Sequence, residues 1–310
     1  MEINTHLDMG KVCAVVVTYN RRELLRVCLQ ALSAQTRPLD EIIVVDNAAT
    51  DGTDHMIFTE FPEVTYMRLS ENAGGAKGFH EGMKLAYDKG YAWIWIMDDD
   101  SKAAVDCLEC LFARNAQANV LTPIQIDSIG RRYGQGLWRG RYVVPAQLKG
   151  MDGTIRVELF SFVGPLISRI VVEMAGFPRD DFFIYADDYE YGLRIRNIGL
   201  KCVAVLDAVI YHDLGGKPIQ VKRLGHTRQR YPQEAWKFYY DTRNTLIMLH
   251  QLGFWERFYA YPWWFYLLLR STVGNLLYEP DWRKRLGYRW LGIQHGIKGI
   301  TGKRVDPDHS

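Results

Sequence analysis

The first half of the chain alternates short apolar runs with segments of helical periodicity. Apolar residues recur at helical spacing over residues 22–35, and helices are also expected after NAGGAKGF, to about Lys89, and from about Ala104. Five apolar runs are predicted to be strands: residues 12–18, 42–45, 64–69, 91–97 and 120–126. Strands that alternate with helices predict an α/β fold with a parallel, doubly wound sheet.

The second half of the chain has a different pattern. Residues 127–165 are rich in glycine, arginine and aromatic side chains, which favours irregular hairpins. Residues 180–196 hold an acidic cluster that turns helical near its middle, and residues 201–211 are predicted to form a strand. From about Gly225 onward the sequence is expected to be helical, aromatic and basic. We therefore predict two regions, residues 1–224 and residues 225–310.

Composition excludes several classes of protein. Of the 310 residues, 48% are hydrophobic and 24% are charged, which is typical of a globular chain, and the net charge of +2 gives no general reason to expect nucleic-acid binding. The segment MEINTHLDMGK lacks the apolar core of a secretory signal. The five cysteines are mostly embedded in apolar segments, so we expect reduced thiols in a cytoplasmic protein.

Polar side chains follow four of the predicted strands. Because the carboxyl ends of parallel strands meet at one edge of a sheet, where ligands bind, these side chains are expected to converge. In chain order they are Thr18 and Asn20, then Asp46, then Asn72 with Gly74, Gly75 and Gly78, and finally Asp98, Asp99 and Asp100. Arg21 and Lys77 could each reach a phosphate from this edge, or remain solvated surface charges.

The three consecutive carboxylates suggest a metal site. Successive side chains of an extended chain point in opposite directions, so Asp98 and Asp100 share one side and Asp99 takes the other. Two carboxylates on one side can bind Mg²⁺ or Mn²⁺ and leave coordination positions open for diphosphate oxygens. The alternative is a solvated acidic turn that caps the following helix. The location at the convergent edge favours the metal.

An ordered set of segments resembles the GT-A glycosyltransferases of family 2 over about residues 12–213. The paired aspartates before a helix, followed downstream by Tyr-His-Asp, are similar to bacterial and mycobacterial galactofuranosyltransferases, more than to rhamnosyltransferases of the same family. The resemblance implies a Rossmann-like catalytic domain within residues 1–224, with a mostly parallel sheet and flanking helices. The segments are VVVTYNR (15–21), IIVVDNAATDGT (42–53), NAGGAKGF (72–79), WIMDDDS (95–101), DDFFIYADDYEYGLRIR (180–196) and VIYHD (209–213).

The resemblance assigns roles to individual residues. It implies that His212 joins Asp98 and Asp100 in holding Mn²⁺ or Mg²⁺, although a lone histidine at a strand end can also simply bond to backbone. It implies that Asp188 is the general base and Asp187 a support or an acceptor contact, although two such carboxylates can also cap a helix. The candidates for binding the nucleotide sugar are Thr18, Asn20, Asp46, Asn72, Gly74, Gly75 and Asp99.

The function that follows is metal-dependent, inverting transfer of a sugar. The best match is galactofuranose from UDP-galactofuranose, transferred to a glycan or lipid-linked glycan in cell-surface polysaccharide synthesis such as that of O-antigen. Transfer of rhamnose or another hexose is the first alternative, and a non-catalytic protein that binds nucleotide sugars is a more remote one. A sugar nucleotidyltransferase would need a glycine-rich phosphate loop after the first strand, where this chain has TYNRREL.

Aromatic residues concentrate in residues 236–252 and 254–277. The longest uncharged apolar run, residues 258–269, is shorter than the roughly 20 residues that span a bilayer. Flanking basic residues would suit a helix in the membrane interface, whereas packing on the sheet domain or in a homo-oligomer would use the same aromatics. The segment YYDTRNTL (239–246) resembles family 2 enzymes that act on lipid-linked glycans, which implies peripheral attachment at the cytoplasmic membrane face.

Overall fold

The computed structural model describes residues 10–128, 130, 132–133, 153–213, 219–223, 226–230 and 233–306. The chain forms two compact units, Met1–Asp180 with Asp188–Asp213, and Asp181–Asp187 with Leu214–Ser310. The predicted boundary between residues 224 and 225 lies outside the described residues, as does much of the predicted hairpin region 127–165.

The first unit is built on one large sheet, whose longest ladders are parallel. Four strands follow the order β3-β2-β1-β4 and are parallel throughout, and β6 and β10 form a second parallel pair. This confirms the predicted α/β class with a mostly parallel sheet. The parallel strands are β1 (Val12–Thr18), β2 (Glu41–Asp46), β3 (Thr65–Arg68), β4 (Trp93–Asp98), β6 (Val120–Ile126) and β10 (Cys202–Tyr211).

Antiparallel strands interrupt the predicted doubly wound pattern. β4 does not pair with β6, because β9 lies between them and is antiparallel to both. A strand of three residues gives no periodic pattern, which explains why the sequence did not predict it. The antiparallel strands of this sheet are β5 (Lys102–Ala103), β7 (Arg132–Tyr133), β8 (Thr154–Val157) and β9 (Leu166–Ser168).

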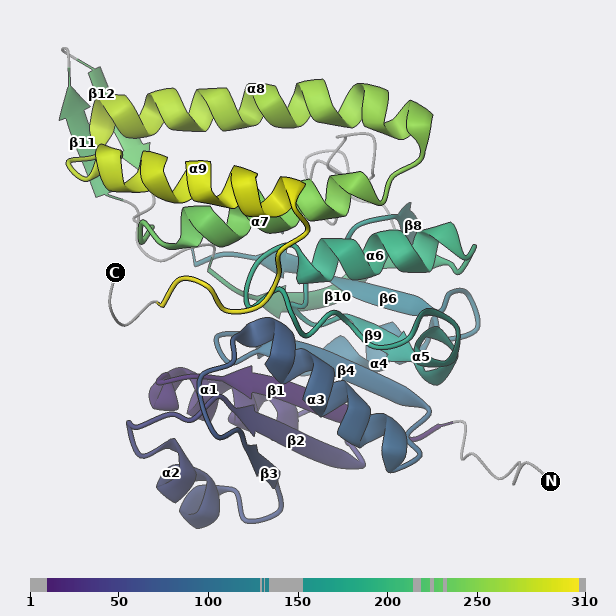
Figure 1. The fold of residues 1–310 in the computed structure, drawn as a ribbon. Coiled ribbons are helices and arrows are strands. Elements are labelled where there is room, and N and C mark those ends of the chain that lie inside the picture. Colours follow the sequence, from purple (N-terminus) through teal and green to yellow (C-terminus); the bar gives the residue numbers. More distant parts are fainter. Residues whose placement is uncertain are drawn as a thin grey trace. The chain divides into compact units, whose positions relative to one another are not determined.

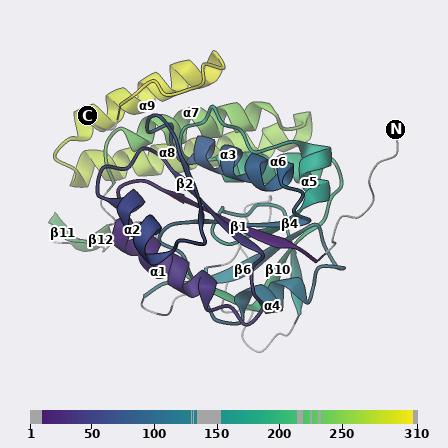
Figure 2. The same cartoon turned by 90° about the horizontal axis from the view of Figure 1, so that it is seen from below.

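Helices cover both faces of the sheet, as Figures 1 and 2 show for this unit. One face carries α1 (Arg22–Ser33), α2 (Thr53–Glu60) and α4 (Cys107–Phe112), and the other carries α3 (Gly75–Asp88), α5 (Arg169–Ala175) and α6 (Asp187–Asn197). Alternate residues of β1 therefore enter two different cores, with Val16 in the first and Val15 in the second. Burial on both faces is the reason why the β1 sequence is a continuous apolar run.

The second unit combines a hairpin with three helices. β11 (Ile219–Arg223) and β12 (His226–Arg230) pair in antiparallel fashion, and α7 (Lys237–His250), α8 (Phe254–Tyr278) and α9 (Trp282–Ile297) lie side by side (Figure 1). The prediction of helix from about Gly225 is thus wrong for residues 226–230, where pairing with β11 decides the conformation. Among the described helices, none combines the length and apolar character needed to cross a membrane.

Two glycines allow α3 to lie close against the sheet beside the predicted nucleotide edge. A Cβ atom added to Gly82 would collide with Cγ1 of Val15 and lie 2.9 Å from Cγ2 of Val45, and one added to Gly78 would lie 2.5 Å from Cγ1 of Val17. These contacts fall on the valines of β1 and β2, whose backbone is fixed by the parallel ladder on both sides. The position of α3 therefore depends on the absence of these two side chains.

We expect Gly82→Ala to destabilise the protein. Overpacking against two central strands costs about 1–3 kcal/mol, more than the ~1 kcal/mol that alanine gains over glycine in helix propensity. The measurement is the free energy of unfolding in urea. Gly75→Ala is the matched control, because no atom lies within 4 Å of the added Cβ in the first turn of the same helix. Equal stability of the two variants would contradict this account of the packing.

Candidate active site

The three aspartates lie at the carboxyl end of β4, beside the end of β1. Asp98 is the last residue of β4 and pairs in register with Val17. Asp99 Oδ2 accepts a hydrogen bond of 2.8 Å from Thr18 Oγ1. The two strands thus bring residues about 80 positions apart in the sequence into direct contact, as the predicted convergence of strand ends requires.

Arg21 neutralises part of this charge. Its Nη1 lies 3.2 Å from Asp99 Oδ1 and 2.8 Å from Asp100 Oδ2. The sequence left Arg21 open as a phosphate ligand or a solvated charge, and the structure shows it paired with two of the three carboxylates. Lys77, the other open candidate, pairs instead with Asp180 at 2.9 Å and Glu81 at 2.8 Å.

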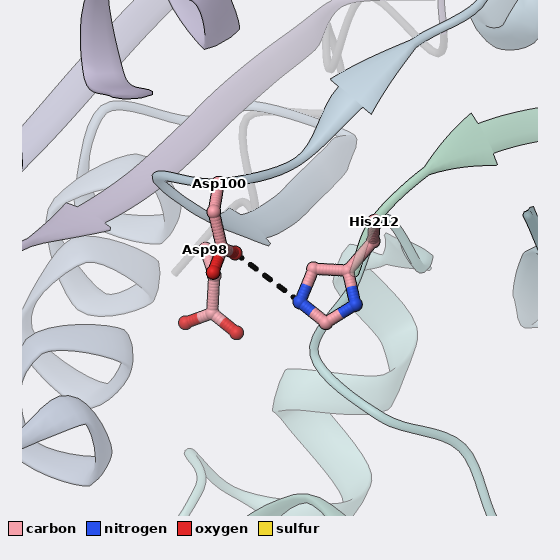
Figure 3. A group of neighbouring side chains, drawn as sticks. All are labelled: Asp98, Asp100 and His212. Carbon is pink, nitrogen blue, oxygen red and sulfur yellow. Dashed lines mark ion pairs between the residues drawn. The ribbon is translucent and has the colours of Figure 1, made fainter. Parts of the chain in front are cut away.

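Asp98, Asp100 and His212 converge from two different strands. One ligand atom from each lies within 4.8 Å of the other two, and Figure 3 shows the His212 ring facing the carboxylates. His212 follows the end of β10, and its backbone N–H donates to the carbonyl of Ile126 at 2.9 Å. Its Nε2 lies 3.2 Å from Asp100 Oδ1. The three residues that the sequence named as metal ligands are therefore brought together.

Burial and neighbouring charge set the protonation of this cluster. Burial, followed by repulsion from Asp100, raises the pKa of Asp98. Burial also raises the pKa of Asp99 to about 6, against the opposing effects of Arg21 and Thr18. Burial alone would raise the pKa of Asp100, but the adjacent His212 and Arg21 outweigh it and lower that pKa. The hydrogen bond and the charge of Asp100 outweigh burial at His212 and raise the pKa of its imidazole.

The donor set fits a divalent cation. Within the described part of the chain, Asp100 Oδ1 and His212 Nδ1 are both buried, and neither has a hydrogen-bond partner of good geometry. Asp100 Oδ1 contacts His212 Nε2, in the ion pair described above. Buried polar atoms without hydrogen-bond partners are rare in proteins and call for an explanation, such as an ion. Two carboxylates and an imidazole are ligands that Mn²⁺ and Mg²⁺ accept, with the imidazole better suited to Mn²⁺.

The second acidic pair begins α6. Asp187 is buried, Asp188 is half-buried, and Asp188 Oδ1 accepts a hydrogen bond of 2.7 Å from the backbone N–H of Tyr189. Glu190 is 1% exposed and forms an ion pair of 2.9 Å with Arg194, so its charge is already engaged. Of the two carboxylates at the start of the helix, Asp188 is therefore the more accessible, and its role as general base stays a prediction.

Asp46, at the carboxyl end of β2, sits in a cluster of its own. Its carboxylate is fully buried and accepts hydrogen bonds from the backbone N–H of Ala49 at 2.7 Å, from Tyr66 Oη and from Arg68 Nη1 at 3.0 Å. The sequence did not identify Tyr66 or Arg68 as partners. Arg68 stands opposite Asp46 in the β2–β3 register, so only knowledge of that register would have found it.

The other residues predicted to bind the nucleotide lie in loops and stabilise their conformation. Asn20 has a left-handed φ of 52°, and its Oδ1 accepts a hydrogen bond of 2.7 Å from the backbone N–H of Thr50, which joins the loops after β1 and β2. Asn72 Oδ1 accepts a hydrogen bond of 3.1 Å from the backbone N–H of Gly74, whose φ is 86°. Gly75 is the first residue of α3, and no atom lies within 4 Å of the position that a Cβ would take there. These residues therefore stabilise the loops at the carboxyl edge of the sheet.

Comparisons with known proteins show the family of this chain. The model of the family described as "Glycosyl transferase family 2" matches residues 13–158. Galactofuranosyltransferase GlfT1 of Mycobacterium tuberculosis is 30% identical to this chain over 90% of its residues and 95% of the relative. The chain belongs to glycosyl transferase family 2. It is therefore a glycosyltransferase.

Two further relatives match along nearly the whole chain. Galactofuranosyltransferase GlfT1 of Mycolicibacterium smegmatis is 29% identical over 92% of this chain and 98% of the relative. The dTDP-rhamnosyl transferase RfbF of Shigella flexneri is 25% identical over 94% of this chain and 97% of the relative.

Solved structures share the fold. Staphylococcus aureus TarS has a TM-score of 0.56 at 15% identity, covering 80% of this chain and 41% of its own. GalNAc-T7, crystallised with UDP, GalNAc and Mn²⁺, has a TM-score of 0.52 at 15% identity and covers 65% of this chain and 43% of its own. At these identities the likeness concerns the fold alone, which is that of the GT-A glycosyltransferases.

We expect Asp100→Asn and His212→Ala each to weaken Mn²⁺ binding by at least about tenfold, because each removes one of three converging ligands. Titration of the free ion by electron paramagnetic resonance measures the affinity. Asp106→Asn is the matched control, since Asp106 is an exposed carboxylate of the same unit outside the cluster. Unchanged Mn²⁺ affinity in both cluster variants would remove these residues as ligands.

Proposed function

We propose that this glycosyltransferase moves galactofuranose from UDP-galactofuranose to a glycan or lipid-linked glycan acceptor, in the synthesis of a cell-surface polysaccharide. The convergence of Asp98, Asp100 and His212 at the carboxyl edge of the sheet carries the proposal, because such a cluster suits a cation bound to a nucleotide diphosphate. Galactofuranosyltransferases among the full-length relatives favour this sugar. Rhamnosyl transfer is the alternative, favoured by the match to RfbF.

The acidic edge would serve the leaving group. Asp98, Asp100 and His212 would hold Mn²⁺ or Mg²⁺, which supplies positive charge opposite the departing UDP diphosphate. Arg21 remains beside Asp99 and Asp100, where it limits the excess negative charge that the diphosphate meets. Asp99 itself is engaged by Thr18 and Arg21, so we assign it to holding this corner of the nucleotide pocket.

The rim of the sheet would bind the nucleotide. Thr18 and Asn20, at and after the end of β1, would line the nucleotide site, and the Asn72 turn with Gly74 and Gly75 would let the backbone approach the ligand. The buried Asp46 carboxylate keeps the loop after β2 in place through the N–H of Ala49 and can offer its remaining acceptor capacity to ribose or uracil.

Asp188 would be the general base. The acceptor hydroxyl oxygen attacks the anomeric carbon as the bond from that carbon to the UDP phosphate oxygen breaks, and the hydroxyl proton passes to the Asp188 carboxylate. Asp187 supports this carboxylate or contacts the acceptor. One displacement inverts the anomeric configuration, so an α-linked donor gives a β-galactofuranoside.

A panel of nucleotide sugars, each with Mn²⁺ and a synthetic lipid-linked acceptor, tests the proposal by UDP release and product identification. We expect UDP-galactofuranose to be the preferred donor. We also expect Asp188→Asn to lower kcat about 10²–10⁴-fold, because the proton loses its acceptor, while UDP affinity is retained. Asp207→Asn, an exposed carboxylate on β10, is the control.

Three outcomes would overturn parts of this function. Preference for dTDP-rhamnose would assign the donor to the rhamnosyl alternative. Turnover of Asp188→Asn at the wild-type rate would exclude Asp188 as the base. Tight UDP binding by a wild-type protein that releases no sugar from any donor would favour a non-catalytic role.

We further propose that α8 attaches the enzyme to an anionic membrane surface on the cytoplasmic side, close to lipid-linked acceptors. Asn275 is the only one of its residues that is buried, and Trp255 and Tyr259 are 72% and 73% exposed. Exposed basic residues adjoin this apolar surface and would complement anionic headgroups. They are Arg257, Arg270, Arg283 and Lys284.

We expect the protein to co-sediment with phosphatidylglycerol vesicles, and the double variant Trp255→Ser, Tyr259→Ser to lose most of this binding. Neither side chain contributes to a core, so the variant should fold. Phe58→Ser, which changes a side chain that is 63% exposed on α2, is the control. Dimerisation that depends on Trp255 and Tyr259, without vesicle binding, would assign the surface to a second copy of the chain instead.

A further inference from the structure

The segment that leads into α6 has an unusual backbone. Phe183, Tyr185 and Ala186 have φ values of 68°, 69° and 63°, in the left-handed region that residues other than glycine rarely adopt. Such strained backbone persists only where surrounding contacts hold it, and it gathers at functional sites. Here the strain lies immediately before Asp187, where α6 begins.

The side chain of Asn244 holds this segment. Asn244 lies on α7 and is fully buried, and its Nδ2 donates to the carbonyls of Phe182, Ile184 and Tyr185 at 2.9, 2.8 and 2.9 Å. The amide has two hydrogens for these three acceptors, so at least one of them is shared. One buried side chain thus gathers three carbonyls from four consecutive residues.

Arg243 fixes the orientation of that amide. Its Nε donates to Asn244 Oδ1 at 2.7 Å, its Nη2 to the carbonyl of Phe182 at 2.9 Å, and its Nη1 to the carbonyl of Gly302 at 2.6 Å. Arg243 is fully buried, and these partners are neutral oxygens. A buried charge whose partners are neutral is expensive to desolvate, so stability alone gives little reason for an arginine here.

Neighbouring groups close the network within the same unit. Gly292 and Gly296 let α9 approach α7 at this level, since a Cβ on Gly292 would lie 2.7 Å from the carbonyl of Tyr239. The ring of Phe183 packs against Tyr240 with centroids 4.8 Å apart. The segment 239–246, which the resemblance linked to lipid-linked glycans, therefore contains residues that make their contacts inside the unit, around the strained segment.

We propose that Arg243 and Asn244 are positioning residues for the transfer reaction. They hold residues 182–186 on a strained path that fixes how the chain enters α6, and so fix the orientation of Asp188, the second residue of that helix. Neither side chain contacts a substrate in this proposal. It rests on the proposed role of Asp188 as general base.

The decisive variant is Asn244→Asp, which keeps the shape of the side chain and replaces the N–H donors with an acceptor. We expect kcat to fall at least about tenfold through misplacement of the base, while UDP affinity with Mn²⁺ stays within about twofold. Hydrogen exchange should rise in peptides covering residues 181–190. Gln251→Glu, an exposed amide-to-acid change just after the same helix, is the matched control.

A rescue variant separates positioning from general stability. Glycine adopts a left-handed φ without strain, so Ala186→Gly in the Asn244→Asp background should lessen the need for the clamp. We expect it to recover kcat at least about threefold over the single variant, without raising its thermal stability. If Asn244→Asp does not fold, Arg243→Lys replaces it as the test variant. It keeps the charge and loses the contact to Asn244 Oδ1, so kcat should fall here too.

Each result decides the proposal. Unchanged hydrogen exchange in residues 181–190 of Asn244→Asp would show that the amide does not hold the segment, and raised exchange with wild-type kcat would show that the segment does not position the base. A fall in UDP affinity equal to the fall in kcat would show that Arg243 and Asn244 stabilise the fold in general and do not specifically position the base. If the wild type transfers no sugar at all, the proposed function fails, and unchanged exchange would refute the clamp separately.

Discussion

Three carboxylates meet at the end of β4, where burial and mutual repulsion both oppose their negative charge. Their compensation comes from side chains that follow other strands: Thr18 and Arg21 after β1, and His212 after β10. The charges can therefore be accommodated only once the sheet has formed and the strand ends have met. The same requirement places the cluster at the edge where α/β sheets bind ligands.

The arrangement of charges at this edge would also allow a divalent cation to replace the positive charge of neighbouring side chains. In the structure, Arg21 and His212 both contact Asp100, and the pKa of His212 is raised by the neighbouring carboxylates. A divalent cation bound by the same carboxylates would take over this role, with a neutral imidazole as ligand. In the proposed function such a cation would bind the diphosphate of the donor, and α6 places Asp188 near a helix start on the same unit.

The aromatic residues of the second unit serve two different purposes. Those of α7 are internal: Tyr239 and Tyr240 are fully buried and surround the Arg243–Asn244 network. Those of α8 are largely exposed, and the proposed membrane attachment would use them. The aromatic residues of the C-terminal region are thus divided between the packed interior around α7 and the exposed surface of α8.

The sequence by itself determined the features that depend on local pattern. The continuous run of β1 predicted its bounds, because a strand buried on both faces has no polar positions, and the Asp98–Asp100 spacing predicted two carboxylates on one side. The candidate metal ligands came from combining that spacing with the resemblance that named His212, and the structure brings the three side chains together. The short insertion of β9, the hairpin strand β12 and the burial of Asp46 between Tyr66 and Arg68 were decided only by tertiary structure. So were the pairing of Arg21 with the aspartates and the hold of Asn244 on residues 182–185. Each of these contacts joins residues from separate segments of the chain, and no periodicity within either segment encodes which partner, or which register, the folded chain will bring to it.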